Sequence, residues 1–334
     1  MRYIIIGAGA IGGTIGARLF SSGREVVLTA RGEHLAALRS GGLRFATPDQ
    51  AVTLPIPAVA GPDELTLRRD DVLIMSVKTQ DATAVLDAWA RQPVPGNQVA
   101  AQALPVFCAL NGVASERMAL RRFRHVYGVS VWLPATHLEP GSVASEGTPK
   151  SGLLPVGRYP AGTDATAAQV AADLSASQFL SPVRADVMRL KYGKLLSNLS
   201  NAVQAMFGIE GGLDEVAAGL RQQVRAEGAA VLDAAGIDYA SPEEQAGLRG
   251  EQIQIATPAG LQARAGGSSW QSLRRGTGSI EADYLNGEIA LLGRLHGVPT
   301  PVNELLQRLA NEFARDRRPP GSITDGEVAQ LLAA

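Results

Sequence analysis

Three polar residues in the second half of the chain have types and a spacing that suit a carbonyl substrate. Asn198 and Asn201 follow Lys194 at i+4 and i+7, so a helix would place all three on one face. A lysine there can donate a proton to a carbonyl oxygen, and two amides can orient a polar substrate. A solvated helix face has the same spacing, and Lys191 stands near the same stripe as a rival lysine. Spacing alone leaves these interpretations open.

A second polar group lies further along the chain, where Ser268 and Ser269 precede Glu281. The pattern predicts a helix from Ser279, which could cap it, so that Glu281 falls in the first turn. The helix dipole stabilises a carboxylate there whatever its role. By itself this group indicates helix capping and no particular chemistry.

A nucleotide motif stands at the N-terminus. An apolar strand over 3–6 leads into a glycine-rich turn, followed by a helix over 11–20 and a strand over 25–29; the turn consists of Gly7, Ala8, Gly9, Ala10, Ile11 and Gly12. The first glycine permits the tight turn, the second lets a pyrophosphate approach the backbone, and the third lets helix and strand pack closely. Free N–H groups at the helix start favour an anion. We expect a dinucleotide site here rather than a merely structural turn.

Residues that follow three of the expected strands extend this site. Arg31 stands where an acidic residue would bind the ribose of NAD and where an arginine suits the 2′-phosphate of NADP. Arg31 can hold that phosphate bidentately, with Thr29 adding a hydroxyl, so NADP(H) is the expected cofactor; an ordinary solvated arginine is the alternative. Lys78 and Asn111 follow strands over 72–77 and 106–110, at the edge where doubly wound sheets bind ligands. Asn111 also begins a common turn dipeptide.

The elements that must position these residues divide the chain into two halves. Strands alternate with helices up to about residue 182, which predicts an α/β fold with an N-terminal Rossmann-like, doubly wound sheet over 1–182. Other expected elements are strands over 127–133 and 152–157, helices over 81–90 and 115–123, short strands within 43–65, and a loop over 139–150. Helical patterns over 186–207, 213–235, 279–296 and 301–315, with no convincing strand, predict a C-terminal all-helical domain over 183–334.

Composition excludes several classes of protein. The 334 residues carry 31 Lys and Arg against 32 Asp and Glu, so no positive surplus exists for nucleic acid. The single cysteine, Cys108, forms no intrachain disulfide or multi-cysteine metal cage and suits a reducing cytosol. The four histidines lack metal-ligand spacing, so we expect no metal. The longest nearly apolar run, 99–110, is too short for a bilayer, and the N-terminus is no signal peptide. We expect a cytoplasmic protein with no membrane partner.

Five motifs, in this order and at this spacing, resemble the ketopantoate reductase (2-dehydropantoate 2-reductase) family. They are the glycine turn, VKTQ at 77–80, NGV at 111–113, YGKLLSN at 192–198 and SSWQSLRRGTGSIEADYLNG at 268–287. The resemblance extends from residue 1 to about residue 315. Its pairing of a lysine–asparagine helix with a serine pair and a glutamate is much more specific than a glycine turn.

The resemblance implies roles residue by residue. The family's catalytic lysine matches Lys194 rather than Lys191, and its active-site glutamate matches Glu281, which would also lie beside the cofactor. Ser269 matches the serine that contacts the substrate carboxylate, and Asn198 matches a substrate-binding asparagine. Lys78 matches a position near the cofactor, and Asn111 matches one near both the nicotinamide and the substrate. The implied reaction is hydride transfer from NADPH to a 2-oxo carbon. Lys194 would donate the proton, Glu281 would hold the hydroxyl, and the helical domain would also form a homodimer.

The chain departs from the family pattern where the substrate fits. Ala202 stands where the family has an asparagine. Asn201 lies one residue earlier, where it either compensates for that asparagine or reads a different substrate. Gly266 and Gly267 precede the serine pair where an asparagine often helps bind ketopantoate, and Trp270 replaces a methionine. The resemblance makes ketopantoate the default substrate, and these departures count in favour of the alternative, another 2-oxo acid or a ketone. Two further alternatives are a non-catalytic NADPH-binding sensor and a related dehydrogenase of a 3-hydroxy acid or an opine.

Overall fold

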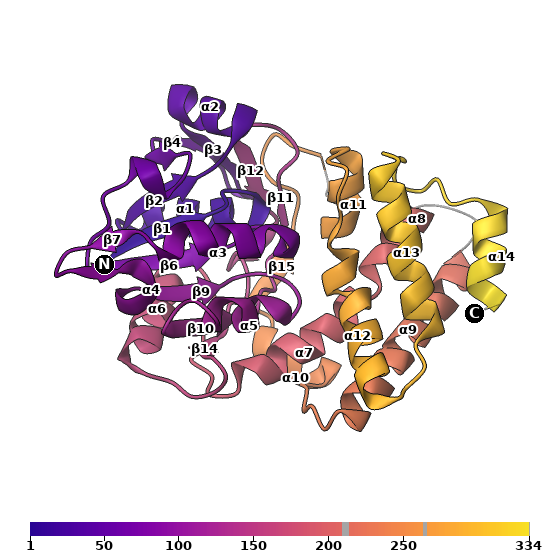
Figure 1. The fold of residues 1–334 in the computed structure, drawn as a ribbon. Coiled ribbons are helices and arrows are strands. Elements are labelled where there is room, and N and C mark those ends of the chain that lie inside the picture. Colours follow the sequence, from indigo (N-terminus) through magenta and orange to yellow (C-terminus); the bar gives the residue numbers. More distant parts are fainter. Residues whose placement is uncertain (209–213, 263–265, 334) are drawn as a thin grey trace. The chain divides into compact units, whose positions relative to one another are not determined.

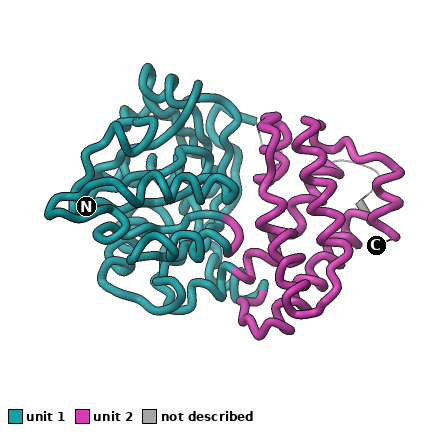
Figure 2. Tube along the Cα trace, viewed as in Figure 1, with its two compact units in different colours: residues 1–110, 114–191, 242–264 teal, residues 111–113, 192–241, 265–334 magenta. Residues whose placement is uncertain are grey.

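The chain folds into two compact units (Figure 2). Unit 1 contains residues 1–110, 114–191 and 242–264, and unit 2 contains residues 111–113, 192–241 and 265–334. The structure, a computed structural model, describes residues 1–208, 214–262 and 266–333.

The borders of the units differ from the single cut after residue 182 that the sequence suggests. Strand β15 (Ile253–Ile255) pairs antiparallel with β13 (Gly147–Pro149), and this pairing draws 242–264, with helix α10 (Pro242–Arg249), into unit 1. Helix α7 (Val187–Asn198) begins in unit 1, because its buried Val187 lies against Gly128 of the sheet. The expectation of no strand after residue 183 is wrong, since a three-residue strand whose partner is distant leaves no local pattern.

Unit 1 is built on a seven-stranded sheet with the order β14-β10-β9-β6-β1-β2-β5. The parallel strands are β1 (Arg2–Ile6), β2 (Glu25–Thr29), β5 (Ala58–Val59), β6 (Asp71–Met75), β9 (Pro105–Cys108) and β10 (His125–Val129), and β14 (Val156–Arg158) is antiparallel to β10. The strand order reverses between β1 and β6. Such a switch point is where doubly wound sheets bind ligands, so the predicted Rossmann-like fold is confirmed.

Helices cover both faces of this sheet (Figure 1). The helices of unit 1 with their short 3-10 turns are α1 (Ala10–Ser21), α2 (Gly32–Gly41), η1 (Pro62–Glu64), η2 (Thr79–Asp81), α3 (Ala82–Ala90), α4 (Ala100–Ala103), α5 (Ala114–Leu120) and α6 (Ala165–Ala176). Tyr3 and Ile5 of β1 pack in a core with α1 and α6, whereas Ile4 and Ile6 pack in a second core with α3, α4 and α5. Alternate side chains of a fully buried strand thus serve two cores.

Smaller sheets account for the irregular stretches. Strands β11 (Ala135–Thr136), β12 (Ser142–Ser145), β3 (Leu43–Ala46) and β4 (Ala51–Leu54) form a four-stranded sheet, and β7 (Pro93–Val94) pairs with β8 (Gln98–Val99). The short strands expected within 43–65 are confirmed. The loop expected over 139–150 instead contains β12 and β13, because both pair with distant segments.

The regular elements described in unit 2 are all helical. They are the end of α7, α8 (Asn201–Phe207), α9 (Asp214–Ala234), α11 (Ser268–Arg274), the 3-10 turn η3 (Glu281–Tyr284), α12 (Asn286–His296), α13 (Pro301–Arg315) and α14 (Asp325–Ala333). Helix α13 buries Val302, Leu306, Leu309 and Phe313 along one face, the spacing of an amphipathic helix. Across the described residues, we find no helix with the length and apolarity needed to cross a membrane.

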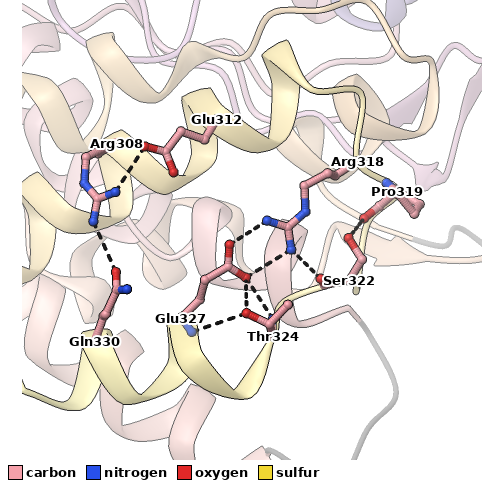
Figure 3. A network of polar contacts seen from close by, with 8 residues as sticks. All are labelled: Arg308, Glu312, Arg318, Pro319, Ser322, Thr324, Glu327 and Gln330. Atoms are coloured by element: carbon pink, nitrogen blue, oxygen red, sulfur yellow. Dashed lines mark hydrogen bonds and ion pairs between the residues drawn. The ribbon is translucent and has the colours of Figure 1, made fainter.

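A polar network holds the start of α14 (Figure 3). Arg318 donates to both carboxylate oxygens of Glu327, at 2.5 and 3.0 Å, and to the Ser322 carbonyl at 2.6 Å. The backbone N–H and the hydroxyl of Thr324 also donate to Glu327, and the Glu327 N–H donates back to the Thr324 hydroxyl. This reciprocal arrangement is a capping box, Thr-x-x-Glu, reinforced by an arginine.

Replacing Glu327 with glutamine is expected to lower the free energy of unfolding by about 1 kcal/mol at neutral pH, because the ion pair with Arg318 is lost; the loss is small because water screens a partly exposed pair. Hydrogen bonds from Arg318 lower the pKa of Glu327 from 4.5 to about 2. A carboxyl whose pKa is lower in the folded state stabilises the fold above its unfolded pKa. The difference between wild type and variant should therefore persist above pH 4.5 and shrink as the pH falls towards 2. Urea denaturation across this range measures it, and a difference independent of pH would contradict the assignment.

Candidate active site

The end of strand β2 holds the glycine turn between β1 and α1. Gly7 has a φ of +100°, which glycine adopts without a steric penalty, and its N–H donates to Thr29 Oγ1 at 3.0 Å. The Ala8 N–H donates to the Thr29 carbonyl at 2.8 Å. The Thr29 side chain is buried, and its hydroxyl oxygen secures the turn by accepting from Gly7.

The other two glycines of the turn serve packing and access. A Cβ on Gly12 would lie 2.1 Å from Ser76 Oγ and 2.2 Å from the Gly7 carbonyl oxygen, so helix and sheet approach closely here. A Cβ on Gly9 would meet nothing within 4 Å. Gly9 precedes α1 with no side-chain cap, which leaves the first N–H groups of the helix directed at an incoming anion. These features fit a dinucleotide pyrophosphate.

Two cationic residues flank this turn. Strands β6, β1 and β2 are parallel neighbours, so their carboxyl ends meet at one edge of the sheet. The exposed Arg31 follows β2, and the half-buried Lys78 precedes η2 beyond the end of β6. Both predicted cofactor residues therefore lie on the same edge as the glycine turn, and their charges suit the phosphates of a dinucleotide.

Lys194 and Asn198 contact each other on the last turns of α7. The Lys194 ammonium donates to Asn198 Oδ1 at 3.0 Å. Asn198 is only 4% exposed, and its Nδ2 has no hydrogen-bond partner, which is rare for a buried amide. The pair can therefore direct an ammonium and an amide N–H at a substrate oxygen.

Asn201 lies in a separate helix. Helix α7 ends at Asn198 and α8 begins at Asn201, so the i+7 relation expected of one continuous helix is wrong. Asn201 Oδ1 would lie 3.9 Å from a Cβ on Gly267, and Gln204 Oε1 accepts from the Gly267 N–H at 3.0 Å. Asn201 therefore lies beside the start of α11, which carries the buried Ser269.

Lys191 has a different environment from Lys194. It is 2% exposed, and its ammonium lies 2.5 Å from Glu116 Oε1. The ammonium also donates to the carbonyl of Leu110 at 3.0 Å and to those of Cys108 and Val129 at 3.4 Å. These contacts use its charge and its hydrogens inside unit 1, so Lys191 is a structural lysine at the ends of β9 and β10.

Glu281 and Asn111 come from distant parts of the sequence but from one compact unit. Glu281 begins η3 and is 4% exposed. Gly112, with a φ of +72°, lies against the same turn, since a Cβ there would be 2.8 Å from the Tyr284 carbonyl oxygen. The turn of Gly112 thus brings Asn111 to η3. Ser279 is not the cap: Ile280 precedes η3, and no side chain caps it.

Arg275 adds a charge that the sequence pattern does not single out. It follows the last residue of α11. Burial lowers the pKa of its guanidinium, and the nearby Glu281 carboxylate opposes that effect. Glu281 thus lies near a cation. This proximity arises because the chain turns back between α11 and η3, which leaves no periodic pattern in the sequence.

A buried amide network ties these segments together. Asn286 Nδ2 donates to the Leu199 carbonyl at 3.1 Å and to Asn303 Oδ1 at 3.0 Å. Asn303 Nδ2 donates to Glu227 Oε2 at 2.7 Å. The end of α7 is thereby fixed to the start of α12, just beyond Glu281. The sequence did carry one signal of this network, because Asn303 falls on the apolar face of α13. A polar side chain buried on such a face is normally hydrogen-bonded.

Two family models match the chain in succession. The model described as ketopantoate reductase PanE/ApbA matches residues 3–159, and that described as ketopantoate reductase PanE/ApbA C terminal matches residues 186–314.

Curated relatives are similar over almost the whole chain. The 2-dehydropantoate 2-reductase of Halobacterium salinarum is 29% identical over 328 residues, which cover 95% of this chain and 100% of that protein. The 2-dehydropantoate 2-reductase of Mesorhizobium japonicum is 27% identical over 346 residues, which cover 95% and 99%.

Solved structures share the fold. A PanE/ApbA family ketopantoate reductase from Ralstonia eutropha JMP134 matches with a TM-score of 0.75 at 24% identity, covering 95% of this chain and 100% of that one. D-mandelate dehydrogenase, solved with NADH and anilino(oxo)acetate, matches with a TM-score of 0.76 at 23% identity, covering 95% and 99%. With family models spanning most of its length, this chain belongs to the ketopantoate reductase family of oxidoreductases acting on CH–OH groups.

Proposed function

We propose that this protein reduces the keto group of a small 2-oxo acid with NADPH, and that ketopantoate is its default substrate. The observation that carries the proposal is the Lys194–Asn198 pair, in which a half-buried ammonium contacts an amide whose Nδ2 is buried and unpartnered. A substrate oxygen would satisfy that amide. The relatives named 2-dehydropantoate 2-reductase support the reaction class.

The proposed division of labour follows from the chemistry of each side chain. When bound, the nicotinamide supplies the hydride. Lys194 donates a proton to the keto oxygen as negative charge develops there, and Asn198 holds the ammonium in place. Glu281 accepts a hydrogen bond from the new hydroxyl. Asn111 borders the nicotinamide, and Ser269 with Asn201 binds the polar end of the substrate.

The cofactor would be held by residues of unit 1. The glycine turn, with backbone N–H groups at the start of α1, would bind the pyrophosphate. Lys78 would neutralise phosphate charge from the end of β6. Arg31 would bind the 2′-phosphate and so select NADPH over NADH.

Replacing Arg31 with alanine is expected to raise the KM for NADPH by about 10- to 100-fold, because a charge-assisted hydrogen bond is lost. The KM for NADH should stay unchanged, since NADH has no 2′-phosphate. Steady-state kinetics with both cofactors measure the ratio. The exposed Arg91 at the end of α3 offers a matched control, and Arg91→Ala should leave the ratio unaltered. Equal losses for both cofactors would contradict the role of Arg31.

Gly266 and Trp270 favour a second candidate substrate. A Cβ on Gly266 would lie 2.5 Å from Trp270 Cγ and 2.7 Å from Cδ2, so the indole ring covers this glycine and leaves no room for a larger residue. The family often has an asparagine here that helps bind ketopantoate. In this chain the indole of Trp270 instead presents aromatic surface next to Ser269. This surface suits a 2-oxo acid with a larger apolar substituent, such as the anilino(oxo)acetate held by D-mandelate dehydrogenase.

A panel of 2-oxo acids tests the proposal and separates the candidates. NADPH oxidation is followed with ketopantoate, pyruvate and phenylglyoxylate under identical conditions. The highest kcat/KM with ketopantoate supports the default substrate, and the highest value with phenylglyoxylate supports the second candidate. Tight NADPH binding without oxidation by any 2-oxo acid would instead identify a sensor. Activity confined to 3-oxo acids or to opine formation would identify a related dehydrogenase.

We also propose that the protein acts in the cytoplasm as a homodimer formed through its helical unit. A dimeric ketopantoate reductase from Staphylococcus aureus has the same fold, with a TM-score of 0.67. Sedimentation equilibrium of the purified protein tests the dimer.

A further inference from the structure

Helix α2 carries a histidine to which the proposed reaction gives no role. His34 Nε2 lies 2.8 Å from the Ala8 carbonyl oxygen, and the Gly141 N–H donates to His34 Nδ1 at 2.8 Å. Because a backbone N–H only donates, Nδ1 accepts, and a neutral ring then carries its hydrogen on Nε2. His34 is therefore a neutral imidazole that donates to the glycine turn.

This contact fixes the orientation of one peptide group. The Ala8 N–H is held by the Thr29 carbonyl and the Ala8 carbonyl by His34. In a planar trans peptide the C=O and the following N–H point in opposite directions, so the Gly9 N–H is directed away from His34. The space beside Gly9 is open to at least 4 Å around a Cβ position.

We propose that His34 is a positioning residue for the dinucleotide: it clamps the Ala8 carbonyl so that the Gly9 N–H faces the pyrophosphate. The inference rests on the proposed pyridine-nucleotide cofactor and assigns His34 no contact with it. A histidine that only filled space in α2 would not need both ring nitrogens in hydrogen bonds of 2.8 Å.

The surroundings favour the neutral ring. The glycine turn carries no titratable side chain, and the segment 137–142 carries His137 and Glu139. The His137 ring lies 4.4 Å from that of His34, and its Nδ1 lies 2.9 Å from the Ser142 carbonyl oxygen. On α2 itself the neighbouring Glu33 is exposed. Burial lowers the pKa of His34 below 6.5, and a proton on Nδ1 would face the Gly141 N–H, so acid must open this contact.

Two isosteric substitutions separate the two hydrogen bonds. Asparagine places an acceptor near the position of Nδ1, so His34→Asn keeps the Gly141 contact and loses the Ala8 contact. Glutamine places an N–H near the position of Nε2, so His34→Gln keeps the Ala8 contact. Titration of protein fluorescence with NADPH should show binding weakened about fivefold to tenfold in His34→Asn, the effect of one lost hydrogen bond, and within about twofold of wild type in His34→Gln. In turnover, the KM for NADPH should rise while kcat stays constant.

Acidity gives a second readout. Below pH 6.5 wild type should lose NADPH affinity relative to His34→Gln, which cannot titrate; titration of the cofactor phosphate affects both proteins equally and cancels. His125 is the first residue of β10 and so lies at the amino ends of the parallel strands, away from the glycine turn; its pKa is also lowered. His125→Gln is therefore the matched control and should retain the wild-type pH profile of NADPH affinity. Thermal melting verifies that each variant is folded.

The outcomes distinguish this inference from the proposed function. Wild type that binds neither NADPH nor NADH would refute the cofactor and hence the proposed function. Wild type that binds NADPH while His34→Asn binds it equally well would overturn only the role of His34. Equal losses in His34→Asn and His34→Gln would also overturn it, because the Ala8 contact would then not be the one that matters.

Discussion

Lys194→Ala should lower kcat for 2-oxo acid reduction by about a thousandfold, within the range that general acid catalysis contributes. The ammonium supplies the proton that the developing alkoxide requires, and Asn198 Oδ1 at 3.0 Å can only orient it. NADPH binding should persist, because the glycine turn and Arg31 are untouched. Stopped-flow measurement of NADPH oxidation under single-turnover conditions separates this chemical step from cofactor binding.

The matched control for this substitution is another lysine outside the site. Lys150, which follows β13, belongs to unit 1, and Lys150→Ala should leave kcat within about twofold of wild type, as expected for a position without such a role. A Lys194→Ala protein that retains more than a few per cent of wild-type kcat would refute the proton transfer assigned to this residue. Asn198→Ala should lower kcat less, because the ammonium remains.

Lys191→Met should instead destabilise the fold by about 3–5 kcal/mol, because it removes the cation that neutralises the buried Glu116 carboxylate. Lys191 is 2% exposed and Glu116 is fully buried. Three backbone carbonyls would also lose a donor. The midpoint and slope of guanidinium denaturation, followed by circular dichroism, measure this loss.

A double substitution isolates the charge pair from packing. Glu116→Leu combined with Lys191→Met removes both charges, and the double variant should recover much of the stability that either single substitution loses. Additive losses would show that the two side chains act independently, against the 2.5 Å contact. The double variant still carries Lys194, so a folded double variant should have a measurable kcat. This result would separate the structural role of Lys191 from the catalytic role proposed for Lys194.

Local patterns were sufficient to predict the geometry of the glycine turn. The glycine turn needs a strand, three glycines and a helix start in succession, all within a dozen residues, so its geometry follows from nearest neighbours along the chain. Lys194 and Asn198 are one helical turn apart, and their contact follows in the same way. Arg31 and Lys78 could be placed on one edge because parallel strands share a direction.

Contacts between distant segments decided the remaining features. The helix that carries Lys194 ends at Asn198, next to the Leu199 carbonyl that Asn286 binds, so Asn201 begins a separate helix. The strand β15 exists only through its partner β13, which shifts the border between the units.

The sequence by itself determined the class of this protein: a Rossmann-like nucleotide domain, a helical domain, and a lysine, amides and a glutamate at family spacing. The resemblance matched Lys194 rather than Lys191 to the family's lysine, but only the tertiary structure showed what Lys191 does, since the two lysines lie three residues apart and differ in what folds against them. The tertiary structure likewise brought Arg275 near Glu281 and the His34 ring into contact with the Ala8 carbonyl of the glycine turn. The physical reason is that periodicity reports which face of an element is buried, whereas charge pairing and hydrogen bonding depend on the partner that the fold brings to that face.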